Sequence, residues 1–208
     1  MIVIVDYKMG NLRSVKKAFE KVGCDAVITS DVEVIRNASK IVLPGVGAFK
    51  DGMKHLEELN LVDVLTEQVL QRKKPFLGIC LGMQLLATKS YENGENKGLS
   101  WIDAEVVKFD FNGFQKKLKV PHVGWNDVVF KNQNRLLDDV KDGSDFYFVH
   151  SYHFQTQEDV VTTTTEYGFD FISSVQKENI YAFQFHPEKS QGVGLKILEN
   201  FVNLESVE

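Results

Sequence analysis

A short stretch around Cys80 places the tightest constraint on the fold of this chain. The apolar residues 76–79 lead directly into Cys80, which has Gly78 and Gly82 two positions away on either side, and helix-like periodicity follows. A sharp strand-to-helix turn of this kind lifts a nucleophile out of a sheet and leaves no room for neighbouring Cβ atoms. A helix expected over 81–88 would offer its N–H groups to a thiolate. An inert, buried cysteine is the alternative, because free cysteines are among the most buried residues of proteins.

Residues 2–88 alternate between short apolar runs and stretches with helical periodicity. We expect strands at 2–5, 26–29, 40–43 and 76–79, and helices at 12–22, 31–37 and 51–73, with a break near Asn60. This order predicts an α/β fold with a mostly parallel central sheet and helices on both faces. The glycines of residues 45–47 would then meet Cys80 at the carboxyl edge of the sheet, where open α/β sheets bind ligands. An ordinary glycine-rich turn is the alternative for residues 45–47.

The second half of the chain has a different pattern. Short segments separated by turn signals predict antiparallel strands at 104–111, 117–120, 127–130, 146–152, 160–166, 171–175 and 181–185, with loops at 90–98 and 121–126. An amphipathic helix is expected over 192–204. The sequence shows no repeat, low-complexity tract or linker, so we expect a single domain over 1–208.

The composition argues against several classes of protein. The chain is 43% hydrophobic and 25% charged, as ordinary globular proteins are. Its net charge of −5 argues against non-specific nucleic-acid binding, and no window approaches the roughly 18 apolar residues of a membrane span. Two cysteines, Cys24 and Cys80, predict neither a disulfide framework nor a zinc site. We therefore expect a reduced, cytoplasmic protein without a metal or cofactor.

A second reactive group follows the strand expected at 181–185. Residues two apart in extended backbone project to the same side, so His186 and Glu188 can point together, and Pro187 between them stiffens the arrangement. Cys80 would attack a carbonyl, His186 would carry the proton, and Glu188 would orient the imidazole. A histidine without chemical function is the alternative, but the neighbouring Pro-Glu and the cysteine turn favour catalysis.

These residues resemble the triad class of glutamine amidotransferases (class I). The resemblance rests on residues 78–84 together with residues 186–188. A narrower resemblance, to the glutaminase subunits of imidazole glycerol phosphate synthases, rests on the blocks 6–7, 9–14, 44–49, 121–126, 147–152 and 184–190. The resemblance covers essentially the whole chain. It implies a three-layer α/β fold with a mostly parallel central sheet and a smaller antiparallel sheet.

The resemblance implies a function for each matching residue. Cys80 would attack the side-chain amide of L-glutamine, forming a γ-glutamyl thioester and releasing ammonia, with His186 as acid and base and Glu188 as its orienting partner. The remaining residues would be oxyanion-hole donors from the backbone of Val46, Gly47 and Leu81, and substrate contacts from Gln84, Glu92, Ser151 and Tyr152. Gln84 facing solvent, and Glu92 as an ordinary loop charge, are the alternatives.

The resemblance also implies a partner. The ammonia would pass to a (β/α)8-barrel cyclase subunit in a heterodimer of histidine biosynthesis, and Trp125 and Lys189 match positions at that interface. Core packing is the alternative for Trp125. Lys8, where the family usually has a glycine, and His153, where it often has another aromatic residue, depart from the pattern. Some relatives serve amidotransferases of surface-sugar biosynthesis, and these departures leave that acceptor open.

Two other classes of protein share part of the pattern. Peptidase-like α/β cysteine proteins usually place a histidine directly after the nucleophilic cysteine, where this chain has Leu81. A non-enzymatic, flavodoxin-like binding domain would leave Cys80, His186 and Glu188 unexplained.

Overall fold

A computed structural model describes residues 1–113 and 118–205 of the chain. The helices are α1 (Leu12–Lys21), α2 (Val32–Arg36), α3 (Phe49–Glu58), α4 (Leu61–Thr66), the π-helical η1 (Glu67–Gln71), α5 (Leu81–Gln84), the 3-10 turns η2 (Arg135–Leu137) and η3 (Pro187–Lys189), and α6 (Gln191–Asn203). The strands are β1 (Ile2–Val5), β2 (Val27–Thr29), β3 (Lys40–Gly45), β4 (Phe76–Cys80), β5 (Lys89–Ser90), β6 (Asn96–Lys97), β7 (Ala104–Lys108), β8 (His122–Asp127), β9 (Val129–Phe130), β10 (Asp145–His150), β11 (Tyr152–Thr156), β12 (Val161–Glu166), β13 (Asp170–Lys177) and β14 (Ile180–Phe183).

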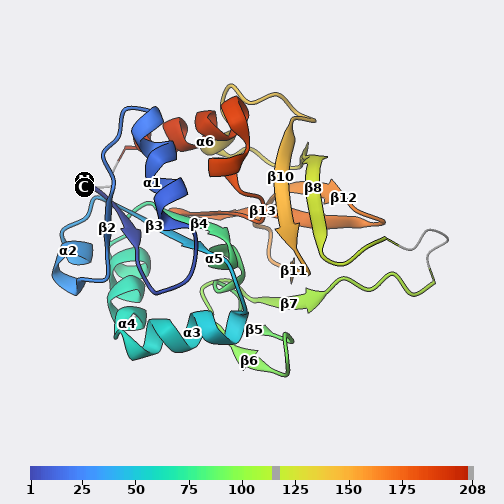
Figure 1. The fold of residues 1–208 in the computed structure, drawn as a ribbon, viewed down its shortest axis with the longest axis horizontal. Helices are drawn as coiled ribbons and strands as arrows, with labels where there is room; N and C mark the ends of the chain where they lie inside the picture. The colour runs from blue at the N-terminus through green and yellow to red at the C-terminus, as the bar shows by residue number, and fades with distance from the viewer. Residues whose placement is uncertain (114–117, 206–208) are drawn as a thin grey trace.

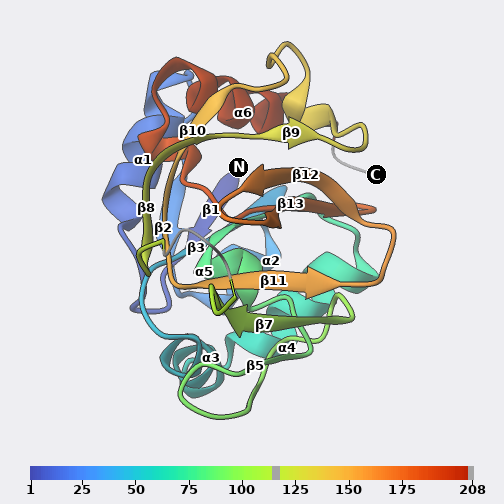
Figure 2. The same cartoon turned by 90° about the vertical axis from the view of Figure 1, so that its right-hand side faces the viewer.

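The main sheet has a parallel half and an antiparallel half. Its parallel part runs in the order β2-β1-β3-β4-β14, and the antiparallel strands β13, β11 and β7 extend it toward β5 and β6. Strands β8 and β10 form a separate antiparallel ribbon and lie side by side (Figure 1 and Figure 2). The predicted fold class, a mostly parallel central sheet flanked by helices with a smaller antiparallel sheet, is confirmed.

Helices cover both faces of the parallel half, which gives three layers. Helices α1 and α6 lie above the sheet in Figure 1, and α2, α3 and α4 lie below it. The alternation along β1 sorts its side chains between these layers. Ile2 and Ile4 pack in the cluster that contains Phe19 of α1, whereas Val3 and Val5 pack in the opposite cluster. Among the described residues, no helix is long and apolar enough to cross a membrane.

The predicted helix starts and breaks have local causes. The side chain of Asn11 accepts a hydrogen bond from the Ser14 N–H at the start of α1, and Asp31 does the same for two N–H groups of α2. The break near Asn60 is confirmed, because Asn60 has a left-handed φ of 54° between α3 and α4. Each cap satisfies backbone donors that the helix cannot satisfy itself.

Four local predictions are wrong. Helix α5 ends at Gln84 rather than near residue 88, and a short hairpin of β5 and β6 replaces the predicted loop at 90–98. The predicted loop at 121–126 is strand β8, which pairs along its whole length with β10. Strand β8 forms by pairing with β10, which lies far away in the sequence, and local turn signals do not report such pairing. The strand expected at 117–120 is absent over residues 118–120, and residue 117 lies outside the described residues.

The turn after β4 is too crowded for side chains at its glycines. A Cβ on Gly82 would lie 1.7 Å from the Leu43 carbonyl oxygen of β3, and a Cβ on Gly78 would lie 2.9 Å from the Gly82 carbonyl oxygen. Helix α5 can therefore begin directly against β3 only because both positions lack a Cβ. Since Gly45 pairs with Cys80 in the β3–β4 register, the two loops meet at one edge of the sheet, as predicted.

Candidate active site

Cys80 occupies a strained turn at the end of β4. Its φ of 53° and ψ of −108° lie in a region that side chains rarely adopt, and such strain concentrates at functional sites. The side chain is 6% exposed and lines a cavity. The structure therefore presents the thiol at the carboxyl edge of the sheet, where the sequence predicted it.

His186 and Glu188 form a buried pair close to this turn. The Nδ1 atom of His186 lies 2.8 Å from Glu188 Oε1, and the two side chains are 2% and 3% exposed. Burial by itself lowers the pKa of His186, but the charges of Cys80 and Glu188 outweigh it and raise that pKa to about 10. The imidazole is thus held as a cation beside Cys80 and Glu188. Its Nε2 is buried without a hydrogen-bond partner within 1–113 and 118–205. Because Cys80 lies close enough to raise the pKa of the ring, this nitrogen can exchange a proton with the sulfur.

Strand β10 holds the backbone around His186. The N–H of His186 donates to the Tyr147 carbonyl, and Ser190 Oγ accepts from the Tyr147 N–H while it donates to the His186 carbonyl. These bonds fix residues 186–190 against the β8–β10 ribbon. The ribbon therefore positions the imidazole, a contribution that the sequence did not reveal.

A cavity of about 420 Å³ brings together most of the predicted site residues. This volume lies within the roughly 300–1,000 Å³ that small-molecule sites occupy. Its lining consists of Val46, Gly47, Cys80, Leu81, Gln84, Glu92, Pro121, Val149, His150, Ser151, Tyr152 and Lys189. Every predicted oxyanion-hole and substrate residue is in this set, whereas His186, Glu188 and Trp125 are not. A single concave site thus offers a nucleophile, glycine-containing backbone and polar side chains.

The glycine-containing loop after β3 lies against Tyr7. Gly47 has a φ of 111°, and a Cβ on Gly45 would lie 2.1 Å from the Tyr7 hydroxyl. That hydroxyl is buried without a hydrogen-bond partner in the described part of the chain, and burial together with the charge of Cys80 raises the pKa of Tyr7. The sequence gave Tyr7 no function, although it follows the carboxyl end of β1 at the same edge of the sheet.

The polar residues at the cavity are held by specific bonds. Glu92 Oε2 accepts from the Phe49 N–H at 2.7 Å, which caps the start of α3 and holds this carboxylate beside the cavity. Burial and the Glu92 carboxylate raise the pKa of Tyr152. The Tyr152 carbonyl already accepts two hydrogen bonds, from Gln84 and His150, so it is less available to a ligand than the rest of residues 151–152.

Gln84 is buried, so the alternative of a solvent-facing helix residue is wrong. Its Nε2 donates to the Tyr152 carbonyl at 3.1 Å and to Gln184 Oε1 at 3.0 Å. Gln184 in turn donates from its Nε2 to Cys80 Sγ at 3.5 Å and is fully buried. Sequence reasoning missed Gln184 as a site residue. Its position two residues before His186, and hence on the same side of extended backbone, is the signal that was available.

Trp125 lies on the surface rather than in the core, where its side chain is 47% exposed. Its ring centre is 6.1 Å from that of Tyr147, its partner in the β8–β10 register. The Lys189 ammonium lies 5.7 Å from the centre of the Tyr147 ring, and Lys189 also lines the cavity. The aromatic surface and the cavity are therefore adjacent.

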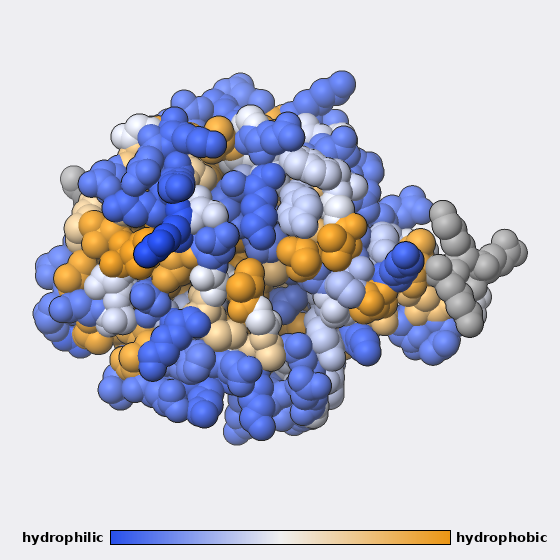
Figure 3. Space-filling model, in the orientation of Figure 1, coloured by the Kyte–Doolittle hydropathy of each residue, from blue (hydrophilic) through white to orange (hydrophobic). Residues whose placement is uncertain are grey.

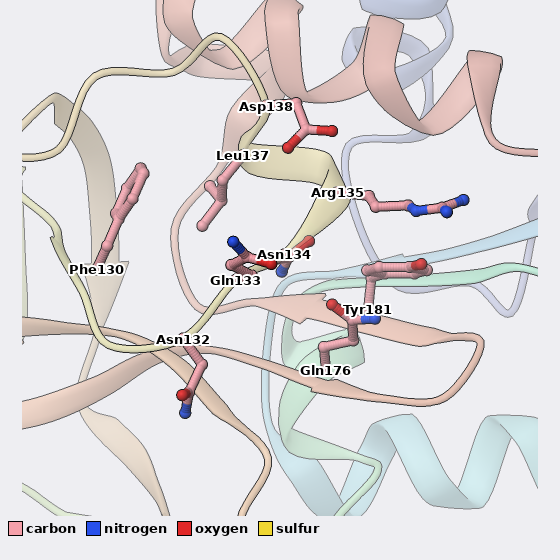
Figure 4. A pocket seen from close by; sticks show the side chains of 9 residues that line it. All are labelled: Phe130, Asn132, Gln133, Asn134, Arg135, Leu137, Asp138, Gln176 and Tyr181. Atoms are coloured by element: carbon pink, nitrogen blue, oxygen red, sulfur yellow. The ribbon is translucent and has the colours of Figure 1, made fainter.

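A second, larger cavity of about 590 Å³ shares no residue with the one at Cys80. Amide side chains, Phe130, Arg135 and Tyr181 line it, and its lining contains no cysteine or histidine. The labelled side chains point in different directions and do not converge on one point (Figure 4). It therefore lacks the nucleophile and base that the site at Cys80 provides. Over 1–113 and 118–205, no cluster of three or more histidine, cysteine or acidic side chains could hold a metal ion.

Known proteins resemble this chain over nearly its whole length. A family model described as glutamine amidotransferase class-I matches residues 3–204. The imidazole glycerol phosphate synthase subunit HisH 1 of Campylobacter jejuni is 50% identical over 204 residues, which are 98% of this chain and 100% of that protein. The corresponding HisH subunit of Aquifex aeolicus is 52% identical over 201 residues, 96% of this chain and 94% of that protein.

Solved structures of lower identity share the fold. One described as the crystal structure of a glutamine amidotransferase superimposes with a TM-score of 0.73 at 20% identity, covering 97% of this chain and 100% of that one. PurLQS from Thermotoga maritima superimposes with a TM-score of 0.72 at 18% identity, covering 97% of each chain. These likenesses support the three-layer architecture.

The charge on His186 predicts an unusual titration. Nuclear magnetic resonance of the ring should show a protonated imidazole up to a midpoint of about 10, because Cys80 and Glu188 hold the cation. In Glu188→Gln the midpoint should fall by about one pH unit or more, since an opposite charge has been removed. His153, whose burial lowers its pKa to about 4, should remain neutral and unchanged in both proteins. A wild-type midpoint at or below about 6.5 would contradict the ion-pair geometry.

Proposed function

Because the chain belongs to the class I glutamine amidotransferase family, we propose that it is the glutaminase subunit of an imidazole glycerol phosphate synthase. It hydrolyses L-glutamine to glutamate and ammonia in histidine biosynthesis. The observation that carries this proposal is the buried triad geometry at the cavity: a strained Cys80 beside a charged His186–Glu188 pair. The assignment to this synthase rests on relatives at about 50% identity that are subunits of imidazole glycerol phosphate synthases.

The first half of the reaction is acylation of Cys80. The thiolate attacks the carboxamide carbon of glutamine, and His186 Nε2 gives a proton to the departing nitrogen, which leaves as ammonia. Glu188 accepts a hydrogen bond from Nδ1, so it keeps the ring in the orientation that aims Nε2 at the reaction. The product of this step is a γ-glutamyl thioester on Cys80.

Backbone N–H groups stabilise the oxyanion that forms in both halves of the reaction. Leu81 follows the nucleophile directly, and Val46 and Gly47 line the same cavity. Preorganised donors at such a site typically contribute about 2.7–4 kcal/mol each to transition-state stabilisation. The second half reverses the proton transfer: His186 takes a proton from water, which attacks the thioester and releases glutamate.

Polar groups of the cavity hold the amino-acid end of the substrate. Glu92 and Gln84 supply oxygen acceptors suited to the α-ammonium and amide N–H groups, and residues 151–152 supply further polar contacts. Lys189, at the cavity edge, supplies a cation for the α-carboxylate or for the partner interface. Together these groups recognise a small, zwitterionic substrate.

The surface beside the cavity suits a partner subunit. Trp125, Val123 and Val46 are 47%, 55% and 40% exposed. A discontinuous band of hydrophobic side chains crosses the middle of the face drawn in Figure 3 toward the β8–β10 ribbon. We propose that a (β/α)8-barrel cyclase subunit covers this surface in a heterodimer and receives the ammonia. A cytoplasmic location fits this biosynthetic role and the two free cysteines.

Replacement of the nucleophile tests the reaction. With the cyclase subunit and its ligand present, Cys80→Ser should lower glutamate release from glutamine by on the order of 10³-fold or more, because the alcohol is a far weaker nucleophile at neutral pH. Cys24→Ser is the matched control. Cys24 lies after α1, outside the cavity, and its loss should leave the rate unchanged. Full glutaminase activity in Cys80→Ser would overturn the assignment.

Replacement of Trp125 tests the partner surface. Trp125→Ala should weaken binding of the cyclase subunit, measured by calorimetry, by about 2 kcal/mol, as buried aromatic anchors of interfaces do. Val129→Ala is the control, because Val129 is 40% exposed but lies on β9, which pairs with β12. Equal affinity in the Trp125 variant would move the interface elsewhere. Purification of the chain with a surface-sugar amidotransferase instead would change the acceptor.

A further inference from the structure

A run of hydrogen bonds leads from the ribbon strand β8 to the nucleophile. Its first part joins Asn126 Nδ2 to His122 Nε2 (3.4 Å), His122 Nδ1 to His150 Nε2 (3.1 Å), and His150 Nδ1 to the Tyr152 carbonyl (2.8 Å). Its second part joins the Tyr152 carbonyl to Gln84 Nε2 (3.1 Å), Gln84 Nε2 to Gln184 Oε1 (3.0 Å), and Gln184 Nε2 to Cys80 Sγ (3.5 Å). Asn126, His122, His150 and Gln184 have no function in the reaction derived above.

The Tyr152 carbonyl determines which atoms donate and which accept in the hydrogen bonds of His150 and His122. The Tyr152 carbonyl can only accept, so His150 must donate from Nδ1. Burial lowers the pKa of His150 to about 3 and that of His122 to about 4, so both rings are neutral. A neutral ring that donates from Nδ1 accepts at Nε2, and His122 must therefore donate from its own Nδ1. The two histidines thus form a directed run that ends on the Tyr152 carbonyl, which also accepts from Gln84.

The orientation of the Gln84 side-chain amide follows in the same way. Both hydrogens of its Nε2 are used, one by the Tyr152 carbonyl and one by Gln184 Oε1. Its Oε1 has no hydrogen-bond partner among the described residues. It is not one of the fully buried polar atoms without a partner, and Gln84 lines the cavity. Gln84 therefore offers an acceptor, and no donor, to a bound molecule. An acceptor matches the N–H groups of glutamine and repels the carboxylate oxygens of glutamate.

We propose that the buried Gln184 is a positioning residue that uses its two ends separately: its oxygen orients Gln84 to accept from the substrate, and its nitrogen donates to the sulfur of Cys80. This inference rests on the proposed function and deepens it, because it assigns glutamine selectivity and thiolate stabilisation to one side chain. Gln184 does not need to touch the substrate.

Two variants test the oxygen and the nitrogen of the Gln184 side-chain amide separately. Gln184→Met removes both hydrogen bonds in a side chain of similar length. Gln184→Glu keeps an oxygen acceptor for Gln84 and, when ionised at about pH 8, loses the donor to sulfur. Gln176→Met is the matched control, because Gln176 lies on strand β13 and, in the part of the chain that the structure describes, its side-chain amide donates only to the Glu178 carbonyl.

Alkylation of Cys80 by iodoacetamide, followed by mass spectrometry of its peptide, tests both hydrogen bonds of Gln184 without the partner subunit. The rate reports the thiolate, the peptide of Cys24 is the internal reference, and protection by added L-glutamine reports the substrate Kd. We expect Gln184→Met to slow alkylation and to weaken the glutamine Kd, each about 5-fold or more. Gln184→Glu should slow alkylation with a Kd within about 2-fold of wild type, and Gln176→Met should change neither.

The proposal is overturned if Gln184→Met and Gln184→Glu do not differ in this way in alkylation rate and glutamine Kd. If both variants alkylate at the wild-type rate, or if both weaken glutamine binding equally, Gln184 has a structural function only, and thermal unfolding alone would register the substitutions. Failure of the proposed function has a different signature. In that case L-glutamine would not protect Cys80 even in the wild-type protein, whatever residue stands at position 184.

Discussion

The contact between the turn after β4 and strand β3 is the constraint on which the rest of the site depends. Gly82 lies so close to the Leu43 carbonyl that a Cβ would meet it at 1.7 Å, and this approach forces Cys80 into its strained conformation. The same contact aligns Gly45 with Cys80, so the glycine-containing loop and the nucleophile share one cavity. The strain is sustained because two buried clusters pack against opposite faces of the parallel strands.

The electrostatics of the site depend on where each histidine is placed. His186 lies beside Cys80 and Glu188, and its pKa rises despite burial. His122, His150 and His153 lie among aromatic rings, and burial lowers their pKa values. Phe109 contacts all three of the latter histidines, with ring centres 4.8–6.4 Å away. One charged ring thus serves proton transfer, and the neutral rings of His122 and His150 serve as directional hydrogen-bond links. The β8–β10 ribbon carries two of those links, and its surface is the proposed partner interface.

The sequence predicted the parts of this arrangement that depend on local pattern. The strands and helices of the parallel half, and the meeting of residues 45–47 with Cys80, follow from short apolar runs and turn signals. Strand β8 was mistaken for a loop because its pairing with β10 joins residues far apart in the chain. Gln184 and Tyr7 escaped notice because their contacts with the site are tertiary. Lys8, the departure from the family's glycine, has a left-handed φ of 64°, the conformation that glycine favours.

The central claim is that Cys80 carries the substrate as a covalent thioester. The direct measurement is rapid acid quenching of the protein during turnover with L-glutamine, followed by mass spectrometry of its peptides. The account predicts a glutamyl adduct on the Cys80 peptide that disappears when glutamine is exhausted, with the Cys24 peptide unmodified. Glutamate formation during which Cys80 never becomes acylated would contradict it.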